Sequence, residues 1–503
     1  MKDYRLVFGL ILVAVVLGFG FQGARGIWQP DEGYYVGTAV TMMDRGTLLV
    51  PYLGEEIFLD KPPMTYWGII GGINVFGSNE FGTRAFNALC YVGTVLAVFW
   101  LGVSIFGRFY EGIAAAFLYA TMAVPFIAAN YITPDTPLVL WTTLLAVFFW
   151  KSVTAQGRKA GVWKVLMSCA LGLGFLAKGP AVLIPCVGFF VFLILRRQFK
   201  SYFFSLSMLA GIFCFCIVGL SWYVYMGFKI PGAAQYFFDS QIWGRLVSAK
   251  FKRNPGLTGA FIYAPVLLAG TLPWSAILWT KLDELRDTVF KKLWWAELLK
   301  RPVALFLLCW FSVPMVLLCL ASSRLGLYSL PLFPAIALVC SRFWLDGKTQ
   351  HAYQFSGAKA WVKPAILCGL WVVVLMGLKF TLGTVYKSEK DARALWQSIK
   401  VHLPEGDYEI VTVDDRCDGL LFYGAKEVEE VTRKKYPYPT FSFRESVAAE
   451  IKGMADEKSS CIFLIKKERH LEPLLTMFRG AGVVFKEVKL PYDRWLVICQ
   501  VKS

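Results

Sequence analysis

The amino-acid sequence predicts an all-α polytopic membrane protein with a small α/β domain at its C-terminal end. Of the 503 residues, 56% are hydrophobic, which exceeds the roughly 45–50% of soluble domains. Charge is also unevenly divided, because residues 1–383 contain 16 acidic and 32 basic residues whereas residues 384–503 contain 19 and 20. We therefore expect a transmembrane domain over residues 1–383 and a water-soluble domain over residues 384–503.

Eleven apolar stretches approach the roughly 20 residues that a helix needs to cross a bilayer. Two of them meet at Lys178, and the long loops could hold a re-entrant pair, so we expect 11–13 transmembrane helices. The first stretch leads directly into a loop that the fold needs, which favours a retained helix over a cleaved signal peptide. The stretches are 6–22, 85–105, 111–129, 135–152, 162–178, 179–196, 203–226, 256–280, 303–320, 325–342 and 361–382.

The distribution of lysine and arginine predicts the orientation. If the N-terminus is cytoplasmic, every loop on the cytoplasmic side is basic, as the positive-inside rule requires. An odd number of spans then places residues 384–503 outside, together with two long loops, 23–84 and 227–255. The net charge of +17 follows from this topology, so no nucleic-acid partner is expected.

Cysteine and histidine give no sign of a metal centre. Nine of the twelve cysteines lie in or beside apolar stretches, where cysteine behaves as a small hydrophobic residue. The other three, Cys417, Cys461 and Cys499, form no paired framework, so no structural disulfide is predicted, with Cys461–Cys499 as the alternative. None of the three histidines falls on the external face of the transmembrane domain, so a divalent cation there would need carboxylate ligands.

The sequence of the C-terminal domain predicts a small α/β unit. Apolar runs such as EIVTV and CIFLI predict strands covered by helices. We expect this domain to shape or cover an active site located elsewhere. The predicted elements are a helix at 390–402, a strand at 408–413, a helix at 416–423, a strand at 460–465, a helix at 468–479, and strands at 482–489 and 494–501.

Acidic residues of the transmembrane domain gather in its first external loop. Seven of the 16 lie within residues 23–84, and none is expected in mid-bilayer. A transporter coupled to protons or ions keeps ionisable groups near the midplane, so this distribution disfavours that class. The external face is therefore the predicted place of any chemistry.

Asp31 follows the first span in the segment WQPDEGYY, where Pro30 suits the first turn of a helix. A carboxylate at the membrane boundary can accept a proton from an incoming hydroxyl group, as a general base does in glycosyl transfer with inversion. The alternative is an acid that only stabilises the N-terminus of a helix.

Lys61 opens a second segment of interest, FLDKPPMTYW. A lysine beside two prolines at headgroup depth is placed to bind a phosphate. It could equally anchor the chain beside a belt of aromatic residues.

Together these segments resemble the first external loop of polytopic GT-C fold glycosyltransferases, specifically the bacterial aminoarabinose transferase of lipid A and the protein O-mannosyltransferases. The likeness covers most of residues 25–340 in order, which chance matches to short motifs do not do. The segments that carry it are WQPDEGYYVGTAVTMMDRGTLLVPYL, FLDKPPMTYW, FGSNEFGTRAFNAL, YITPD, GFLAKG, PVLLAGTLPW and SRLGLY.

The resemblance implies an enzyme that moves a sugar from a polyprenyl-phosphate donor to a lipid, glycan or protein acceptor. It would act as a monomer in the cytoplasmic (inner) membrane of a bacterium, with the C-terminal domain in the periplasm. The phosphate leaving group explains why no nucleotide-binding fold is needed, and no cofactor is certain, although a divalent cation remains an option. The alternative is a flippase or other transporter of lipid-linked sugars; a receptor-like or assembly protein is a third class.

The resemblance also implies roles for individual residues. Asp31 would be the catalytic carboxylate, and Asp135 would position the acceptor or an arginine. The residues expected to bind substrate are Lys61 and Arg245 at the donor phosphate, Tyr328 lining the same cavity, Lys178 as a further phosphate ligand or a simple boundary lysine, and Glu32, Tyr35 and Asp60.

The chain departs from the family pattern at three positions. Tyr34 stands where the aminoarabinose transferase has an arginine, Phe58 where a tyrosine is usual, and Gln241 where there is a histidine. We therefore expect a different sugar and acceptor. We also expect the site residues to converge on one external cavity, with Asp31 within roughly 10 Å of Lys61, about one Debye length.

Overall fold

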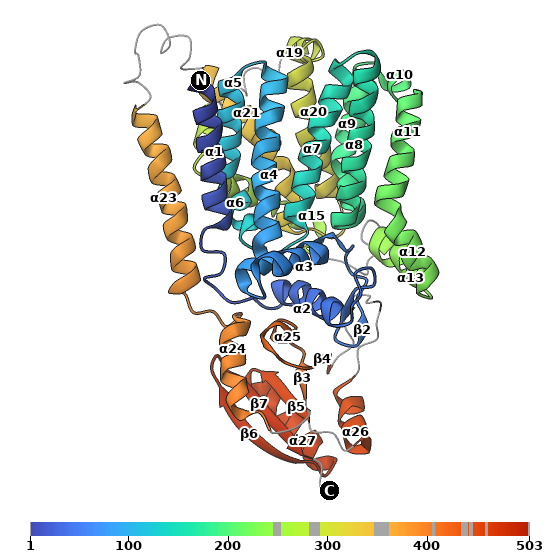
Figure 1. Ribbon diagram of the computed structural model, residues 1–503, viewed down its shortest axis with the longest axis vertical. Helices are drawn as coiled ribbons and strands as arrows, with labels where there is room; N and C mark the ends of the chain where they lie inside the picture. The colour runs from blue at the N-terminus through green and yellow to red at the C-terminus, as the bar shows by residue number, and fades with distance from the viewer. Residues whose placement is uncertain are drawn as a thin grey trace. The chain divides into compact units, whose positions relative to one another are not determined.

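The computed structural model describes residues 2–244, 253–280, 292–346, 362–404, 408–433, 441, 446–457 and 461–500. Contacts divide the chain into two compact units (Figure 1), which we call the helical unit (Met1–Gly20 with Asn87–Lys379) and the mixed unit (Phe21–Phe86 with Phe380–Ser503). Residues 21–86 therefore group with the C-terminal segment, whereas the sequence suggested a division after residue 383.

The helical unit consists of apolar helices that stand side by side in Figure 1. Two of its helices, α4 (Glu80–Phe106) and α23 (Val362–Thr384), continue into the mixed unit. The others are α1 (Lys2–Phe19), α5 (Phe109–Thr121), α6 (Ala123–Ala129), α7 (Asp135–Thr154), α8 (Gly157–Lys178), η1 (Gly179–Val182), α9 (Leu183–Leu195), α10 (Phe199–Phe203), α11 (Leu206–Phe215), η2 (Cys216–Leu220), α12 (Ser221–Lys229), α13 (Ala233–Tyr236), η3 (Phe237–Trp243), α15 (Gly256–Ala260), α16 (Tyr263–Gly270), α17 (Ser275–Trp279), α19 (Lys292–Leu298), α20 (Pro302–Leu320), η5 (Gly326–Leu332) and α21 (Phe333–Asp346).

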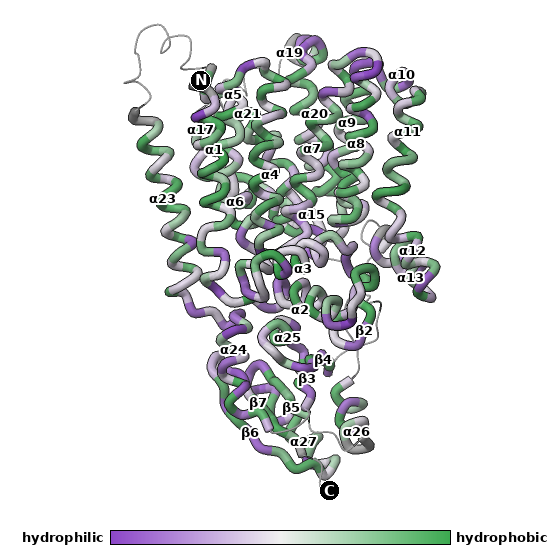
Figure 2. The backbone as a smooth tube through the Cα atoms, viewed as in Figure 1, coloured by the Kyte–Doolittle hydropathy of each residue, from purple (hydrophilic) through white to green (hydrophobic). Residues whose placement is uncertain are grey.

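Within the described residues, seven helices are long and apolar enough to cross a membrane, or eight if the bent pair α5 and α6 forms one span. Figure 2 shows the apolar colouring along these helices and polar residues near α10 and α19. Fewer helices meet this criterion than the 11–13 predicted, because α8 and α9 count as one stretch, Gly157–Leu195, and the helices Tyr4–Phe19 and Thr258–Gly270 are shorter. Each of the eleven predicted stretches nevertheless coincides with apolar helix. The chain is a multi-pass membrane protein.

Aromatic rings and small residues pack the helical unit. The rings of Phe149 and Phe189 stack with centroids 4.7 Å apart, and Phe306 adds a third ring 5.9 Å from Phe149. A Cβ atom at Gly188 would lie 2.5 Å from the carbonyl oxygen of Cys309. Glycine therefore permits the close approach of α9 to α20, as small residues do in membrane helix pairs.

In the mixed unit, residues 21–86 form two helices, α2 (Asp31–Asp44) and α3 (Met64–Phe76), joined through a short hairpin of β1 (Tyr52–Leu53) and β2 (Glu56–Ile57). Proline stands immediately before each helix, at Pro30 and Pro63, where its fixed φ suits a helix start. The helix start that the sequence predicts at Pro30 is thus the start of α2.

The C-terminal segment forms a five-stranded sheet in the order β4-β3-β5-β7-β6. Strand β3 is parallel to β4 and β5, and β7 is antiparallel to β5 and β6. The elements are α24 (Ala392–Ile399), η7 (Lys400–His402), β3 (Glu409–Val413), α25 (Leu420–Tyr423), β4 (Val428–Val431), α26 (Val447–Glu457), β5 (Cys461–Lys466), η8 (Glu468–His470), α27 (Leu471–Gly480), β6 (Val484–Leu490) and β7 (Arg494–Gln500).

Both faces of the sheet are covered, so strands β3 and β5 are largely apolar and buried, as expected of doubly buried strands. Val411 and Phe463 pack with Phe478 of α27 on one face, whereas Ile410 and Ile462 belong to the core on the other face, with Leu395 of α24 and Leu420 of α25. The α/β prediction is confirmed, and none of the twelve cysteines, Cys461 and Cys499 included, forms a disulfide in the described residues.

Two elements of this domain were not predicted. β4 is an edge strand of four residues of which Glu429 and Glu430 are acidic, a composition that protects sheet edges but hides them from sequence patterns. α26 does carry a helical signal, because Val447, Ile451 and Met454 are all buried at helical spacing.

The two chain segments of the mixed unit are joined by backbone pairing. Trp28 and Asp391 form an antiparallel bridge, with the amide of Gln29 donating to the carbonyl of Lys390 at 2.8 Å. Glu80 accepts hydrogen bonds from Arg393 at 2.8 Å and from the hydroxyl group of Tyr423 at 2.9 Å. The first loop and the C-terminal domain are therefore one folded body.

A group of carboxylates around the start of β3 predicts that this sheet loses stability as the pH rises above about 4.5. Partial burial, with Glu429, Glu427 and Glu450 nearby, raises the pKa of Glu409 from 4.5 to about 9. The folded state then holds a proton that the unfolded state has released, so stability should fall as pH rises from about 4.5 to about 9.

We expect Glu409→Gln to abolish this loss. The measurement is hydrogen exchange of peptides from β3 in the full chain, corrected for intrinsic exchange rates, at pH 5 and pH 8.5. The wild type should lose protection at the higher pH and the variant should not. Equal protection of the two proteins at both values would contradict the raised pKa.

Candidate functional site

Glu32, on the first turn of α2, is buried within an ion network of the mixed unit. Its carboxylate is fully buried and accepts hydrogen bonds from both Arg25 and Arg84. The Arg84 contacts are 3.0 Å from Nε to Oε1 and 2.9 Å from Nη2 to Oε2. The backbone amide of Trp28 is a further donor at 3.0 Å.

Burial by itself raises the pKa of Glu32, but the two arginines more than offset it, and the pKa lies far below its usual range. Arg84 also donates to the carbonyl oxygens of Gln22, Arg25 and Gly26. The network therefore holds residues 22–32 in place. Both carboxylate oxygens of Glu32 accept hydrogen bonds within the protein, and the residue has no exposed surface. Its predicted contact with substrate stays a prediction.

Asp31 precedes Glu32 by one residue and is exposed. It lies in the first turn of α2, three residues before Tyr34, so the two side chains share one face of the helix. Burial raises the pKa of Tyr34, and the charges of Asp31 and Asp60 raise it further. The phenol of Tyr34 thus stays protonated between two carboxylates.

Tyr35 was also predicted to bind substrate, but only 2% of it is exposed. Its ring centroid lies 4.2 Å from that of Tyr34 and 6.2 Å from that of Tyr66. Tyr35 therefore packs between α2 and α3, and its predicted contact with substrate stays a prediction.

Lys61 and Asp60 are adjacent at the entry to α3. The Lys61 ammonium donates to the carbonyl oxygen of Asp60 at 3.0 Å and lies 3.8 Å from its carboxylate. The side chains are 13% and 33% exposed. Lys61 is thus a partly neutralised cation close to the surface, and its predicted proximity to Asp31 stays a prediction.

Arg416 of the C-terminal segment also reaches this loop. Its guanidinium carbon lies 5.2 Å from the ring centroid of Tyr34 and 5.4 Å from that of Phe58, within the range of a cation–π contact worth about 0.5–2 kcal/mol. Tyr34 and Phe58 are two of the positions at which the chain departs from the family pattern.

Sequence reasoning missed Arg25, Arg84 and Arg416. A signal existed for Arg84, which stands in an apolar helix whose other charged residue is Glu80, since an arginine in such a helix needs a partner. Arg416 offered no comparable signal, because it lies in a polar loop nearly 400 residues from Tyr34.

The helical unit brings together three of the predicted residues. The Lys178 ammonium, at the end of α8, lies 2.5 Å from Asp135 Oδ1 at the start of α7, with side chains 11% and 7% exposed. It also lies 4.5 Å from the ring centroid of Tyr328 in η5. Asp135 and Lys178 thus form an ion pair, so Lys178 has specific partners and does not only mark the end of a helix. Arg245 lies outside the described residues.

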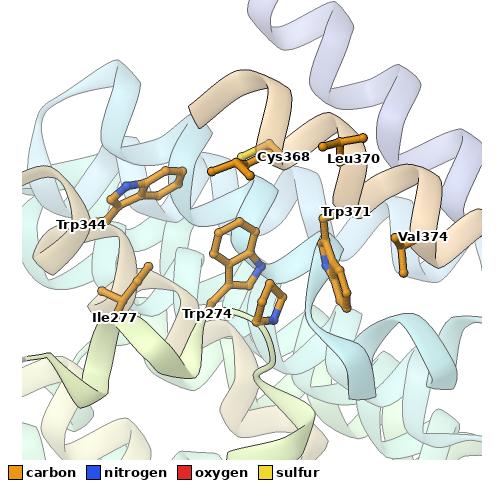
Figure 3. A pocket seen from close by; sticks show the side chains of 9 residues that line it. Trp274, Ile277, Trp344, Cys368, Leu370, Trp371 and Val374 are labelled. Carbon is orange, nitrogen blue, oxygen red and sulfur yellow. The ribbon is translucent and has the colours of Figure 1, made fainter. Parts of the chain in front are cut away.

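An apolar cavity of about 480 Å³ opens in the helical unit (Figure 3). The indole N–H groups of Trp274 and Trp371 both donate to Thr121, at 2.9 and 2.8 Å, so their rings offer carbon to the cavity. A smaller apolar hollow of about 360 Å³ in the mixed unit is lined by Leu48, Leu49, Trp67, Ile70, Gly71 and Asn74. Neither is lined by a predicted site residue.

Among the described residues, Glu409, Glu450 and Cys461 form a group whose ligand atoms lie within 4.8 Å of one another. They lie on β3, α26 and β5 of the C-terminal sheet. None of the predicted site carboxylates belongs to this group.

The two neighbouring acids of α2 make opposite predictions for stability. Glu32→Gln should destabilise the protein by about 3–5 kcal/mol, because it leaves the buried Arg84 and the partly buried Arg25 without their anion. Asp31→Asn is the matched control and should stay within about 0.5 kcal/mol of wild type, as exposed substitutions do. Thermal unfolding in detergent at pH 7 measures both. An unchanged melting temperature for Glu32→Gln would contradict the structural role.

Comparison with known proteins agrees with this architecture. The family model for dolichyl-phosphate-mannose-protein mannosyltransferases matches residues 60–222. The undecaprenyl phosphate-alpha-4-amino-4-deoxy-L-arabinose arabinosyl transferase of Photorhabdus laumondii is 26% identical over 328 residues, which are 64% of this chain and 56% of that protein. The chain thus spans little more than half the length of that relative.

Two solved structures share the fold. The crystal structure of ArnT from Cupriavidus metallidurans bound to undecaprenyl phosphate aligns with a TM-score of 0.76 at 18% identity, covering 99% of this chain and 98% of that one. The archaeal oligosaccharyltransferase AglB from Archaeoglobus fulgidus aligns with a TM-score of 0.54 at 11% identity, covering 98% and 74%. The chain therefore has the GT-C fold, and its predicted resemblance to the aminoarabinose transferase and protein O-mannosyltransferases is confirmed.

Proposed function

We propose that this protein is an inverting glycosyltransferase that moves a sugar from a polyprenyl-phosphate donor to a hydroxyl group of a lipid or glycan acceptor, at the outer face of a bacterial inner membrane. The names of its relatives and the undecaprenyl phosphate bound to ArnT support the donor class. The observation that carries the proposal is the contrast on α2, where Glu32 is locked in an ion network and Asp31 is left exposed.

Asp31 acts as the general base in this scheme. The acceptor oxygen attacks the anomeric carbon, and its proton passes to the Asp31 carboxylate. The bond between the anomeric carbon and the phosphate oxygen breaks, and its electron pair leaves with the polyprenyl phosphate. Attack opposite the leaving group inverts the anomeric centre.

Cations stabilise the negative charge that grows on the leaving phosphate. Lys61 is proposed for this role, with Arg245 as its partner. Asp135, Lys178 and Tyr328 form a second polar cluster in the helical unit, and we propose that it orients substrate. We propose that the protein acts as a monomer and that membrane lipids surround its apolar helices.

Formation of a glycosidic bond separates this function from that of a flippase. A flippase carries a labelled polyprenyl-phosphate sugar across a vesicle membrane but leaves the sugar on its lipid. A transferase releases polyprenyl phosphate and yields a labelled acceptor. The assay is therefore product formation in proteoliposomes with undecaprenyl-phosphate sugars and extracted lipid A as the first acceptor.

Asp31→Asn should reduce transfer by roughly 10²–10⁴-fold, the usual cost of losing a general base. Asp44→Asn is the matched control, because Asp44 is an exposed acid at the other end of the same helix. It should transfer sugar like the wild type. Transfer at the wild-type rate by Asp31→Asn would exclude the proposed base.

Lys61→Ala should weaken donor binding by about 1.5–3 kcal/mol, the value of a charge-assisted contact. Asp60→Asn is the informative partner, since it removes the carboxylate that lies 3.8 Å from the ammonium and should leave binding unchanged or tighter. Titration of undecaprenyl phosphate into protein in nanodiscs measures both. Unchanged affinity of Lys61→Ala would place the phosphate elsewhere.

A further inference from the structure

Arg416 belongs to a loop that ion pairs hold firmly after strand β3. Its Nε and Nη2 atoms both lie 3.0 Å from Asp418 Oδ2, and Nε lies 3.5 Å from Glu430 Oε2. The neighbouring Asp415 pairs with the buried Arg494 at 2.7 Å. The side chain of Arg416 is 17% exposed. Its ion pairs with residues of the C-terminal domain therefore restrict the orientation of the guanidinium group.

The other side of this guanidinium faces the first external loop. It lies over the rings of Tyr34 and Phe58, which pack edge to face with centroids 5.7 Å apart. Tyr34 stands one helical turn after Asp31, and Phe58 stands three residues before Lys61. Arg416 is therefore in contact with two rings, each of which stands three residues from a proposed functional residue in the sequence, and all of these residues belong to the mixed unit.

The charge of Arg416 argues against a direct phosphate contact. Two carboxylates, Asp418 and Glu430, already face its single positive charge, and they are 6% and 12% exposed. A phosphate would meet a net negative group at this point. The guanidinium group of Arg416 is planar and can pack against aromatic rings, whereas the ammonium group of a lysine has no such plane.

We propose that Arg416 is a positioning residue for sugar transfer, which holds the Tyr34 ring and through it the orientation of Asp31. This inference rests on the proposed function. It makes the C-terminal domain a part of the catalytic apparatus, because the residue that sets the geometry of the base comes from that domain. Loss of Arg416 should then lower kcat and leave the affinity for donor unchanged.

The experiment is a double-mutant cycle on full-length protein in nanodiscs. Arg416→Ala should lower kcat by roughly 10–100-fold, the scale expected when a reacting group is misplaced by about 1 Å. Arg416→Lys should rescue little of this loss. In a Tyr34→Ala background, Arg416→Ala should cause no further loss, since residues that act through one contact are not additive.

The control is Arg433→Ala, which breaks an ion pair with Asp414 at 2.5 Å in the same domain. It should leave kcat unchanged. An equal loss in Arg433→Ala, additive losses in the cycle, or weaker undecaprenyl-phosphate binding in Arg416→Ala would each overturn the inference. Wild-type protein without transfer would overturn the proposed function itself, whereas wild-type transfer with an unaffected Arg416→Ala overturns the positioning role alone.

Discussion

The conformation of residues 22–32 depends on one buried carboxylate. Glu32 is surrounded by the guanidinium groups of Arg25 and Arg84, and Arg84 also binds three backbone carbonyls. Desolvating these ions is costly, and the cost is recovered only if every group is paired with good geometry. The network therefore admits one arrangement of residues 22–32, and it fixes the start of α2 to the first turns of α4.

The same network explains how two adjacent acids come to differ. A helix turns by about 100° per residue, so once Glu32 points into the ion network, Asp31 must point elsewhere, and it is exposed. One carboxylate is held ionised by its cations, and the other is exposed to solvent. Environments that separate neighbouring carboxylates in this way commonly divide structural and chemical roles.

Several contacts join the C-terminal domain to the segment that the ion network holds. The bridge between Trp28 and Asp391, the contacts of Glu80 with Arg393 and Tyr423, and the stacking of Arg416 on Tyr34 all join the sheet domain to the loop. These contacts come from a domain that has no nucleotide-binding or nucleophile motif of its own. The helical unit has its own polar contact, in which Lys178 joins the ends of α7 and α8 to Tyr328.

The sequence by itself determined the apolar segments, the two loop helices and most of the sheet, because these depend on local periodicity and helix-start chemistry. It also singled out Asp135, Lys178 and Tyr328, which the structure brings into contact. Only the tertiary structure decided that Glu32 and Tyr35 are interior residues while Asp31 is exposed, since burial depends on partners such as Arg84 and Tyr66. The contact between Arg416 and Tyr34 was likewise visible only in the tertiary structure. Two residues nearly 400 positions apart leave no local pattern in the chain.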